Sequence, residues 1–157
     1  VREHIRRIHA AGLRVHGMFV FGFDTDRADT MERTVAFARD LALSSVQFMV
    51  LTPLPGSRTS DQMVAEGRLL SRNWAHYDAH HVVFQPRATS PAQLQRWQVE
   101  GHRRYYQLLP TLRRWSARDL LIAIYARRIN RDWQRDNADF LGSLCEELPP
   151  APALAAK

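Results

Sequence analysis

The sequence predicts an α/β protein with parallel strands, and two observations lead to this fold class. Two short apolar runs, at 15–23 and 46–51, are rich in β-branched and aromatic residues, and neither alternates cleanly between apolar and polar positions. Strands have this pattern when helices bury both of their faces. A helical pattern separates the runs, whose ends at Phe23 and Leu51 are roughly 30 residues apart, the length of a βαβ unit.

The predicted elements of the first half follow one another closely. Residues 2–11 have the apolar spacing of a helix, and Gly12 suits the left-handed residue that ends it. We expect the helix between the strands to begin at Asp29, because Asp29 and Glu32 have capping-box spacing. Its buried stripe would comprise Met31, Val35, Ala38 and Ala42, widened by Phe37 and Leu41. A short helix at 61–66 follows the second strand.

The second half is predicted to be mainly helical. A loop and a short strand ending at Pro86 come first. Ser90, with a proline next and a glutamine three positions later, is typical of a helix start. This helix would run to Pro110 and carry the stripe Leu94, Trp97, Gly101, Tyr105 and Leu108.

Two more helices are expected after residue 116. The first would be built on Leu120, Leu121, Ile124 and Tyr125, and the second would cover 132–144. The final residues, 149–157, are rich in proline and alanine, so we expect a disordered tail. The order of helix, strand, helix and strand at the start is that of an α/β barrel or doubly wound sheet entered midway.

Composition restricts the kinds of protein that this chain can be. The net charge is +6, with 22 basic and 16 acidic residues. Cys145 is the single cysteine, so an intrachain disulfide and a cysteine cage for a metal are excluded. No apolar run approaches the about 20 residues that span a bilayer, so a cytoplasmic protein is expected. The chain opens at Val1 inside a helical pattern, and we expect a piece of a longer polypeptide.

Candidate binding residues lie where the strands end, because ligands of parallel sheets bind at the carboxyl ends of the strands. Gly22 lies at the carboxyl end of the first run, and either a closely approaching ligand or a tight strand–helix junction explains a glycine there. Gly17 and Gly22 miss the G-x-G-x-x-G spacing, which argues against a dinucleotide-binding turn. Helix capping accounts for Asp29, whereas the role of Asp26 stays open.

The second run ends in Thr52-Pro53-Leu54-Pro55-Gly56-Ser57. Each proline fixes its own φ and extends the residue before it, so this loop is stiff. A stiff loop can present backbone groups to a flat ligand with little loss of entropy. The alternative is a rigid connection without a ligand.

Two other clusters have chemical interest. The segment 76–81 contains three histidines, but it lacks the glutamate of H-E-x-x-H, and packing explains them better than a metal. Residues 96–131 hold nine arginines among aromatic residues, against Glu100 and Asp119. Such a segment can bind RNA or lie on an anionic membrane. A solvated face of packed helices is the preferred interpretation.

Several motifs occur in a characteristic order. The first is Phe21-Gly22-Phe23-Asp24-Thr25-Asp26, which a helix follows. Leu51 with the prolyl loop comes next, and then Trp74-x-x-Tyr77-Asp78. Over roughly residues 1–108 the sequence resembles cobalamin-binding radical SAM proteins, the group containing anaerobic magnesium-protoporphyrin ester cyclase and hopanoid-pathway enzymes. The resemblance implies the C-terminal part of an incomplete (β/α) barrel with parallel strands, followed by a helical extension. The two runs would be its fifth and sixth strands.

The resemblance also implies a site for S-adenosylmethionine. Its cofactor-binding residues would be Val20, Gly22, Asp26, Leu51, Thr52 and Pro53. Val20 and Gly22 match the apolar residue and the glycine that back the adenine in the family. Asp26 stands where many members have a glutamate, and the residues after the second strand would line the far side of the adenosyl pocket.

The cysteine loop that holds the [4Fe–4S] cluster in this family is absent, and one cysteine cannot hold a cluster. We therefore expect a fragment without catalytic activity of its own. The parent would use S-adenosylmethionine, the [4Fe–4S] cluster and cobalamin for methyl transfer or cyclisation on an apolar or tetrapyrrole-like substrate. Expected partners are the missing N-terminal half of the same polypeptide, a small-molecule substrate and a reductant protein, and no nucleic acid.

These interpretations divide the chain into three segments. Residues 1–87 would form the second half of the barrel, 88–148 the helical C-terminal extension and 149–157 the disordered tail. The alternative function is a non-catalytic, arginine-rich helical module that binds RNA, an anionic membrane or a protein partner. A half barrel would also leave an open apolar edge on its first strand.

Overall fold

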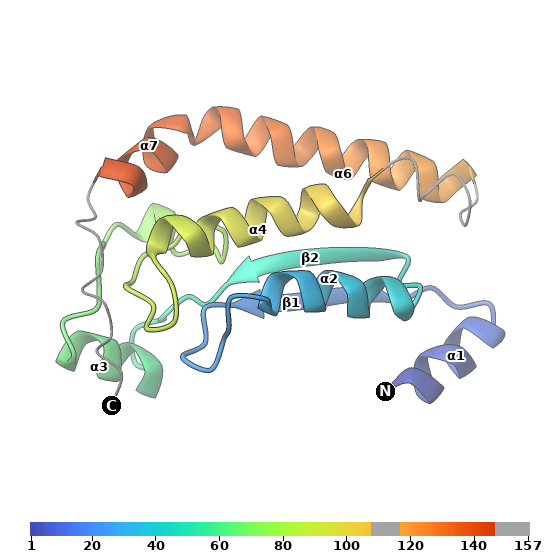
Figure 1. Ribbon diagram of the computed structural model, residues 1–157, viewed down its shortest axis with the longest axis horizontal. Helices are drawn as coiled ribbons and strands as arrows, with labels where there is room; N and C mark the ends of the chain where they lie inside the picture. Colours follow the sequence, from blue (N-terminus) through green and yellow to red (C-terminus); the bar gives the residue numbers. More distant parts are fainter. Residues whose placement is uncertain (108–116, 147–157) are drawn as a thin grey trace.

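The computed structural model describes residues 1–107 and 117–146, in which two strands pack against a set of helices (Figure 1). In chain order the elements are α1 (Arg2–Ala10), β1 (His16–Phe21), α2 (Thr30–Asp40), β2 (Ser45–Val50), α3 (Arg58–Ala65), the 3-10 helix η1 (Trp74–His76), α4 (Pro91–Tyr105), α6 (Ala117–Asp136) and α7 (Ala138–Glu146). This order confirms a mixed α/β protein. Leu108, Pro110 and the predicted tail at 149–157 lie outside the described residues.

β1 and β2 are parallel neighbours, as predicted. His16 pairs with Ser45 and Phe21 pairs with Val50, and α2 makes the connection between the strands. β1 is shorter than the run 15–23 that predicted it, whereas β2 has the same length as the run 46–51 and begins one residue earlier. Among the described residues the sheet has these two strands, so the larger barrel stays a prediction.

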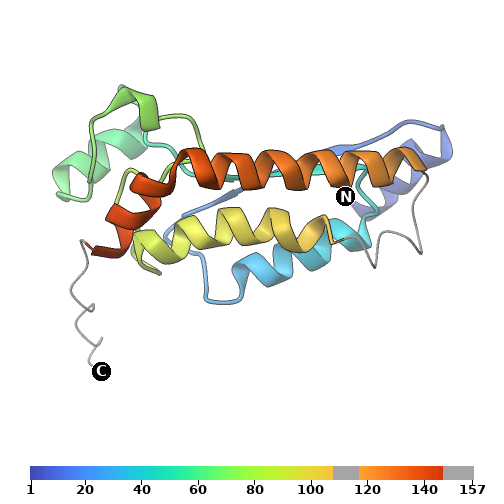
Figure 2. The ribbon, with the colours of Figure 1, turned by 90° about the horizontal axis from the view of Figure 1, so that it is seen from above.

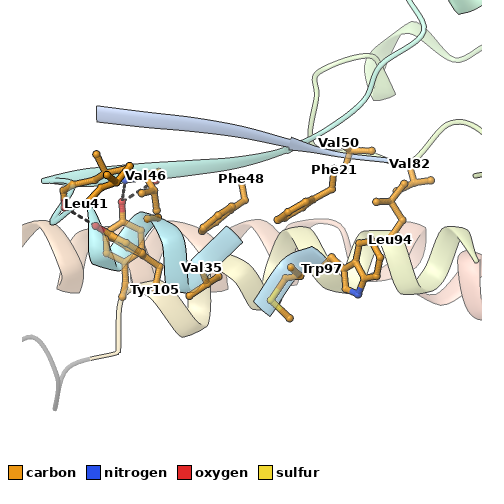
Figure 3. Packing of buried hydrophobic residues seen from close by; sticks show 14 of the residues in the cluster. Phe21, Val35, Leu41, Val46, Phe48, Val50, Val82, Leu94, Trp97 and Tyr105 are labelled. Atoms are coloured by element: carbon orange, nitrogen blue, oxygen red, sulfur yellow. Dashed lines mark hydrogen bonds between the residues drawn. The ribbon is translucent and has the colours of Figure 1, made fainter. Parts of the chain in front are cut away.

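Helices cover one face of this sheet. Phe21, Phe48 and Val50 are buried on that face against α2 and α4 (Figure 3). Side chains of a strand alternate between faces, and the other face of β1 carries the half-buried Val20 and Met18, which is 60% exposed. The prediction that both faces are buried is therefore wrong for the part of the chain that the structure describes.

Helix α4 approaches the sheet closely because of a glycine. A Cβ atom on Gly101 would lie 3.1 Å from the ring of Phe48, so a larger residue would push α4 away from β2. The predicted start of α4 is confirmed, since the Ser90 hydroxyl accepts a hydrogen bond from the Gln93 N–H at 3.1 Å. The described positions of its predicted stripe are also confirmed, with Leu94, Trp97, Gly101 and Tyr105 all buried.

The predicted capping box of α2 is wrong. Asp29 precedes the helix, but its φ of −95° and ψ of 3° differ from an extended cap, and its side chain accepts no capping hydrogen bond. The Thr30 hydroxyl instead accepts from the Arg27 N–H at 2.8 Å. The stripe is confirmed for Met31, Val35, Ala38 and Leu41, which are buried, and wrong for Phe37 and Ala42, which are exposed.

Two other boundaries also differ from the sequence prediction. α3 begins at Arg58 instead of 61, because the Ser57 hydroxyl accepts from the Ser60 N–H at 3.2 Å and caps the helix three residues earlier. The short strand expected before Pro86 is reduced to one antiparallel bridge between Leu69 and Phe84.

Helix α6 turns an unexpected face toward the protein. Ala123 is buried and Ala126 half-buried, whereas Leu121, Ile124 and Tyr125, which were expected to face the core, are 66%, 49% and 66% exposed. Small residues on the inner side let α6 lie close to α4, and the two helices run side by side (Figure 2). α6 also continues through the expected start of the last helix at 132, and α7 begins only at Ala138.

The two outer edges of the sheet are in different states. On β2, the Tyr106 hydroxyl bonds to Val46, the Phe48 N–H donates to Nε2 of His102 at 3.2 Å, and the Val50 N–H donates to the Ala79 carbonyl at 2.8 Å. On β1, the backbone groups of residues 18 and 20 point away from β2 and meet no hydrogen-bond partner among the described residues. The sheet is therefore closed at β2 and open at β1.

Candidate functional site

The carboxyl ends of β1 and β2 lie next to each other and define the candidate site. The Leu51 N–H donates to the Phe21 carbonyl at 2.8 Å, which continues the strand pairing one step beyond the sheet. The turn that leaves β1 and the prolyl loop that leaves β2 therefore start from neighbouring positions. The structure thus brings together the two segments in which the sequence placed its candidate residues.

Asp26 fixes the shape of the turn after β1. One oxygen of its carboxylate accepts hydrogen bonds from the Gly22 N–H at 2.7 Å and the Phe23 N–H at 3.1 Å. The Asp26 N–H in turn donates to the Phe23 carbonyl at 3.0 Å. A carboxylate that accepts two backbone N–H groups makes strong, charge-assisted bonds. The sequence left the role of Asp26 open, and these hydrogen bonds show that Asp26 stabilises the turn after β1.

Gly22 is explained by packing at the junction. Its φ is +108°, a conformation that favours glycine. A Cβ atom there would lie 3.0 Å from Leu94, 3.1 Å from Phe84 and 3.4 Å from Leu51. Of the two explanations that the sequence allowed, these contacts favour a tight strand–helix junction.

Val20 and the prolyl loop occupy different environments. Val20 pairs with Met49 across the sheet, and both are half-buried on the face that the helices leave uncovered. Pro53 is buried, and Thr52 is half-buried with its hydroxyl donating to the Val50 carbonyl at 3.3 Å. Within this set, Val20 therefore lies on the accessible side of the sheet, whereas Pro53 supports the loop from within.

An ion-pair network that the sequence analysis missed braces the same region. Arg68 is buried and binds Asp24 through two hydrogen bonds, at 2.7 and 3.1 Å, and Glu66 at 3.0 Å. Its Nε also donates to the Gln85 carbonyl at 2.7 Å. Arg87 adds ion pairs to Asp24 at 3.2 Å and to Glu66 at 2.7 Å. The network joins the turn after β1 to the end of α3.

The charges of this network are matched, two arginines against two carboxylates. Hydrogen bonds from Gln62 and Arg68 lower the pKa of Glu66 to about 2, so that Glu66 stays ionised at neutral pH. No local spacing pattern connects Arg68 with Asp24, because they are far apart in the sequence. The sequence indicates this network only by containing two acidic residues, Asp24 and Glu66, with which each arginine could pair.

The histidines of 76–81 form hydrogen bonds and ring contacts. Nδ1 of His81 lies 3.0 Å from the Asp78 carboxylate, and its Nε2 lies 2.8 Å from the side-chain oxygen of Asn137. His76 stacks on His81 with ring centroids 4.7 Å apart. In the residues that the structure describes, no group of three or more His, Cys, Asp or Glu side chains is arranged to hold a metal ion.

The chain is similar to proteins named as methyltransferases. It is 36% identical over 66 residues to an uncharacterized methyltransferase of Pyrococcus horikoshii, covering 42% of this chain and 14% of that protein. It is 25% identical over 116 residues to the bacteriochlorophyllide d C-12(1)-methyltransferase of Chlorobaculum tepidum, covering 74% and 25%. An uncharacterized methyltransferase of Synechocystis is 31% identical over 71 residues, covering 45% and 13%.

These alignments span a quarter or less of each relative's length. No protein-family model matches the chain. None of the described helices is both long and apolar enough to cross a bilayer. The similarity therefore associates the chain with methyltransferases.

Proposed function

We propose that this chain is the C-terminal part of a radical SAM methyltransferase, with the exits of β1 and β2 forming half of the site for the adenosyl group. The observation that carries the proposal is the parallel pair β1–β2, whose two exits are held adjacent by the bond from Leu51 to Phe21. Similarity to methyltransferases supports the same conclusion. Residues 1–87 then belong to the barrel and 88–148 to the helical extension.

S-adenosylmethionine fits the residues that are present. Val20 and Met49 offer an apolar surface on the uncovered face, which suits one side of an adenine ring. The half-buried Leu51 and Thr52 would line the opposite side of the pocket. Asp26 and Gly22 act on the shape of the turn, and Pro53 on the shape of the loop. When bound, the cofactor supplies the methyl group or, in a radical reaction, the deoxyadenosyl group.

The [4Fe–4S] cluster does not fit this chain. Cys145 is the single cysteine, and the described residues contain no cluster of metal-binding side chains. Three cysteines are the minimum that the family's loop supplies, so we derive no step through the cluster. We propose that preceding parts of the same polypeptide carry it, together with any cobalamin site.

The different edges of the sheet support an incomplete barrel. β1 exposes unpaired backbone groups on its outer edge, whereas side chains close the edge of β2. A preceding strand can pair with β1, and a following strand has no place at β2. One relative is named as a bacteriochlorophyllide d methyltransferase, and we propose a tetrapyrrole-like substrate for the parent protein.

Binding of S-adenosylhomocysteine, measured by calorimetry, tests the proposal. The longer polypeptide that contains this chain should bind it, and Val20→Asp should weaken binding at least about tenfold, since a charge would face the adenine. Val64→Asp is the matched control, because it introduces the same charge at a valine of α3 that is 47% exposed. It should leave the affinity within about twofold.

The 157-residue chain alone should bind S-adenosylhomocysteine weakly or not at all. Tight binding by this chain would contradict its being half of a site. Absence of binding by the longer polypeptide, or equal losses in both variants, would contradict the assignment of Val20. The coding sequence upstream of Val1 should also contain a C-x-x-x-C-x-x-C motif.

A further inference from the structure

A groove lined by arginines lies between α4 and α6. The two helices run antiparallel, with α4 between the sheet and α6 (Figure 1). Its volume is about 410 Å³. Its lining comprises Arg103, Ile124, Arg127, Arg128, Asn130, Arg131 and Gln134. Four arginines, an asparagine and a glutamine therefore line this space, and no Asp or Glu is among its lining residues.

The positive charge of the groove is only partly neutralised. Arg103 binds Glu100 through two hydrogen bonds, at 2.6 and 2.7 Å, and Arg128 lies 3.7 Å from the Asp132 carboxylate, but Arg127 and Arg131 form no ion pair with a carboxylate of the described residues. These two arginines are one helical turn apart, and like charges at this spacing repel. An anion in the groove would relieve the repulsion and bind both guanidinium groups.

A row of exposed apolar side chains adjoins the groove. Leu121, Ile124, Tyr125 and Ile129 are between 49% and 66% exposed, and their spacing places them along the outer side of α6. Ile124 belongs to both features, since it also lines the groove. Arg128 lies beside the row, within the same helical turns. The outer surface of α6 thus combines exposed apolar side chains with the positive charge of Arg127 and Arg131 in the adjoining groove.

We propose that this surface binds an anionic phospholipid membrane, with lipid phosphate groups in the groove between α4 and α6. The apolar row would enter the boundary between headgroups and acyl chains, as on helices that lie in the plane of a membrane. Arginines near an anionic bilayer add an attraction that the apolar row alone lacks. α6 is the outermost layer (Figure 1), so it can meet a flat surface without moving other elements.

The composition of the row favours lipid over nucleic acid. Single-stranded nucleic acids bind through aromatic side chains on which bases stack, and three of the four exposed side chains are aliphatic. Contact with a phosphate backbone contributes little binding free energy for aliphatic side chains, whereas transfer from water to an acyl environment is favourable for them. An RNA ligand would leave this part of the surface in water.

Co-sedimentation with vesicles tests the proposal. The chain should bind vesicles of phosphatidylcholine mixed with phosphatidylglycerol, and bind pure phosphatidylcholine much more weakly. Arg127→Gln with Arg131→Gln should reduce binding at least about tenfold, as should Leu121→Ser with Tyr125→Ser. Arg127→Lys with Arg131→Lys should retain most of it. Arg7→Gln with Arg72→Gln is the control, because it removes the same charge from exposed positions elsewhere.

Circular dichroism would verify that each variant is folded. Equal binding to both kinds of vesicle, or an equal loss in the control pair, would overturn the proposal, because adsorption would then be non-specific. Unchanged vesicle binding after Leu121→Ser with Tyr125→Ser would also overturn it and leave a site for a free anion such as pyrophosphate. If the chain bound an RNA oligonucleotide more tightly than vesicles, and Arg127→Gln with Arg131→Gln abolished that binding, the ligand of this surface would be nucleic acid and not lipid.

The same measurement on the longer polypeptide decides whether the surface is available there. The proposal would be supported if the longer polypeptide bound vesicles and the variants weakened its binding in the same order as in the 157-residue chain. Loss of vesicle binding in the longer polypeptide would overturn the proposal, since another part of that protein would then cover α6. Neither outcome depends on the adenosyl site, because Val20→Asp should leave vesicle binding unchanged.

Discussion

The single hydroxyl of Tyr106 satisfies both backbone groups of Val46. It accepts a hydrogen bond from the Val46 N–H and donates one to the Val46 carbonyl, each at 2.8 Å. Tyr106 lies just past the last residue of α4, and Val46 lies at the start of β2, so this side chain attaches the end of the helix to the sheet edge. Where another strand would have to pair, a phenol already occupies both positions.

Tyr106→Phe should destabilise the protein by about 2 kcal/mol, because it leaves a buried N–H and a buried carbonyl without partners. Chemical denaturation followed by circular dichroism would measure the loss. Tyr125→Phe is the matched control, since Tyr125 is 66% exposed, and it should change the free energy of unfolding by less than about 0.5 kcal/mol. Equal effects of the two substitutions would contradict this account of the β2 edge.

Asp26 and Asp29 precede the same helix but should respond differently to substitution. Asp26→Ala removes the acceptor of two backbone N–H groups and should cost about 1–3 kcal/mol. Asp29→Ala removes only an exposed ion pair with Arg33 at 3.8 Å and should cost less than about 0.5 kcal/mol. Thermal unfolding of both variants gives the comparison. A larger loss for Asp29 would show that the cap, and not the turn, organises this segment.

Stability should fall in mild acid because of His102. Its Nε2 accepts the Phe48 N–H and its Nδ1 lies 2.9 Å from the Gln98 carbonyl, so the folded ring is neutral. Burial lowers the pKa of His102 from 6.5 to about 4. The unfolded chain therefore takes up a proton first, and stability that is complete above pH 6.5 is lost as the pH falls toward 4, by up to about 3 kcal/mol.

Denaturation at a series of pH values would reveal this loss. His102→Gln keeps an acceptor for the Phe48 N–H without a titrating group, so its stability should vary less between pH 6.5 and 4. Burial lowers the pKa of His80 as well, so part of the dependence should remain. His4→Gln, at an exposed position, should retain the full dependence. An unchanged profile in His102→Gln would exclude His102 as its main source.

The open edge of β1 should make the isolated chain self-associate. Unpaired backbone groups and the exposed Met18 offer a template for pairing with another strand. Sedimentation velocity should show association that increases with concentration. Met18→Lys should reduce it, because a charge on an edge strand opposes pairing. A single monomeric species across the whole concentration range would contradict the prediction.

Local patterns predicted the elements well, because apolar spacing and capping residues act over a few positions. The start of α4 at Ser90 and the parallel pairing of β1 with β2 follow from such patterns. Burial was less predictable. Met18 lies in an apolar run, yet the run does not reveal whether a second layer covers it. Likewise, Leu121 and Tyr125 are apolar at helical spacing, but α6 packs through Ile122, Ala123 and Ala126 instead.

The candidate site was only partly predictable for the same reason. The sequence located the two strand exits, because these follow directly from the βα order. It did not reveal the brace formed by Arg68 and Asp24, because the pairing depends on how α3 returns toward β1. The contact between Gly101 and Phe48 similarly joins residues that no sequence spacing relates.

The closed edge at β2 gives the sheet a direction of growth. During synthesis β1 leaves the ribosome before β2, and Tyr106 arrives only after α4 is complete. The edge that stays free thus belongs to the strand that is made first, and Tyr106, which occupies the other edge, is made later. In the described part of the chain, the end of α4 therefore restricts the addition of a further strand to the β1 side of the sheet.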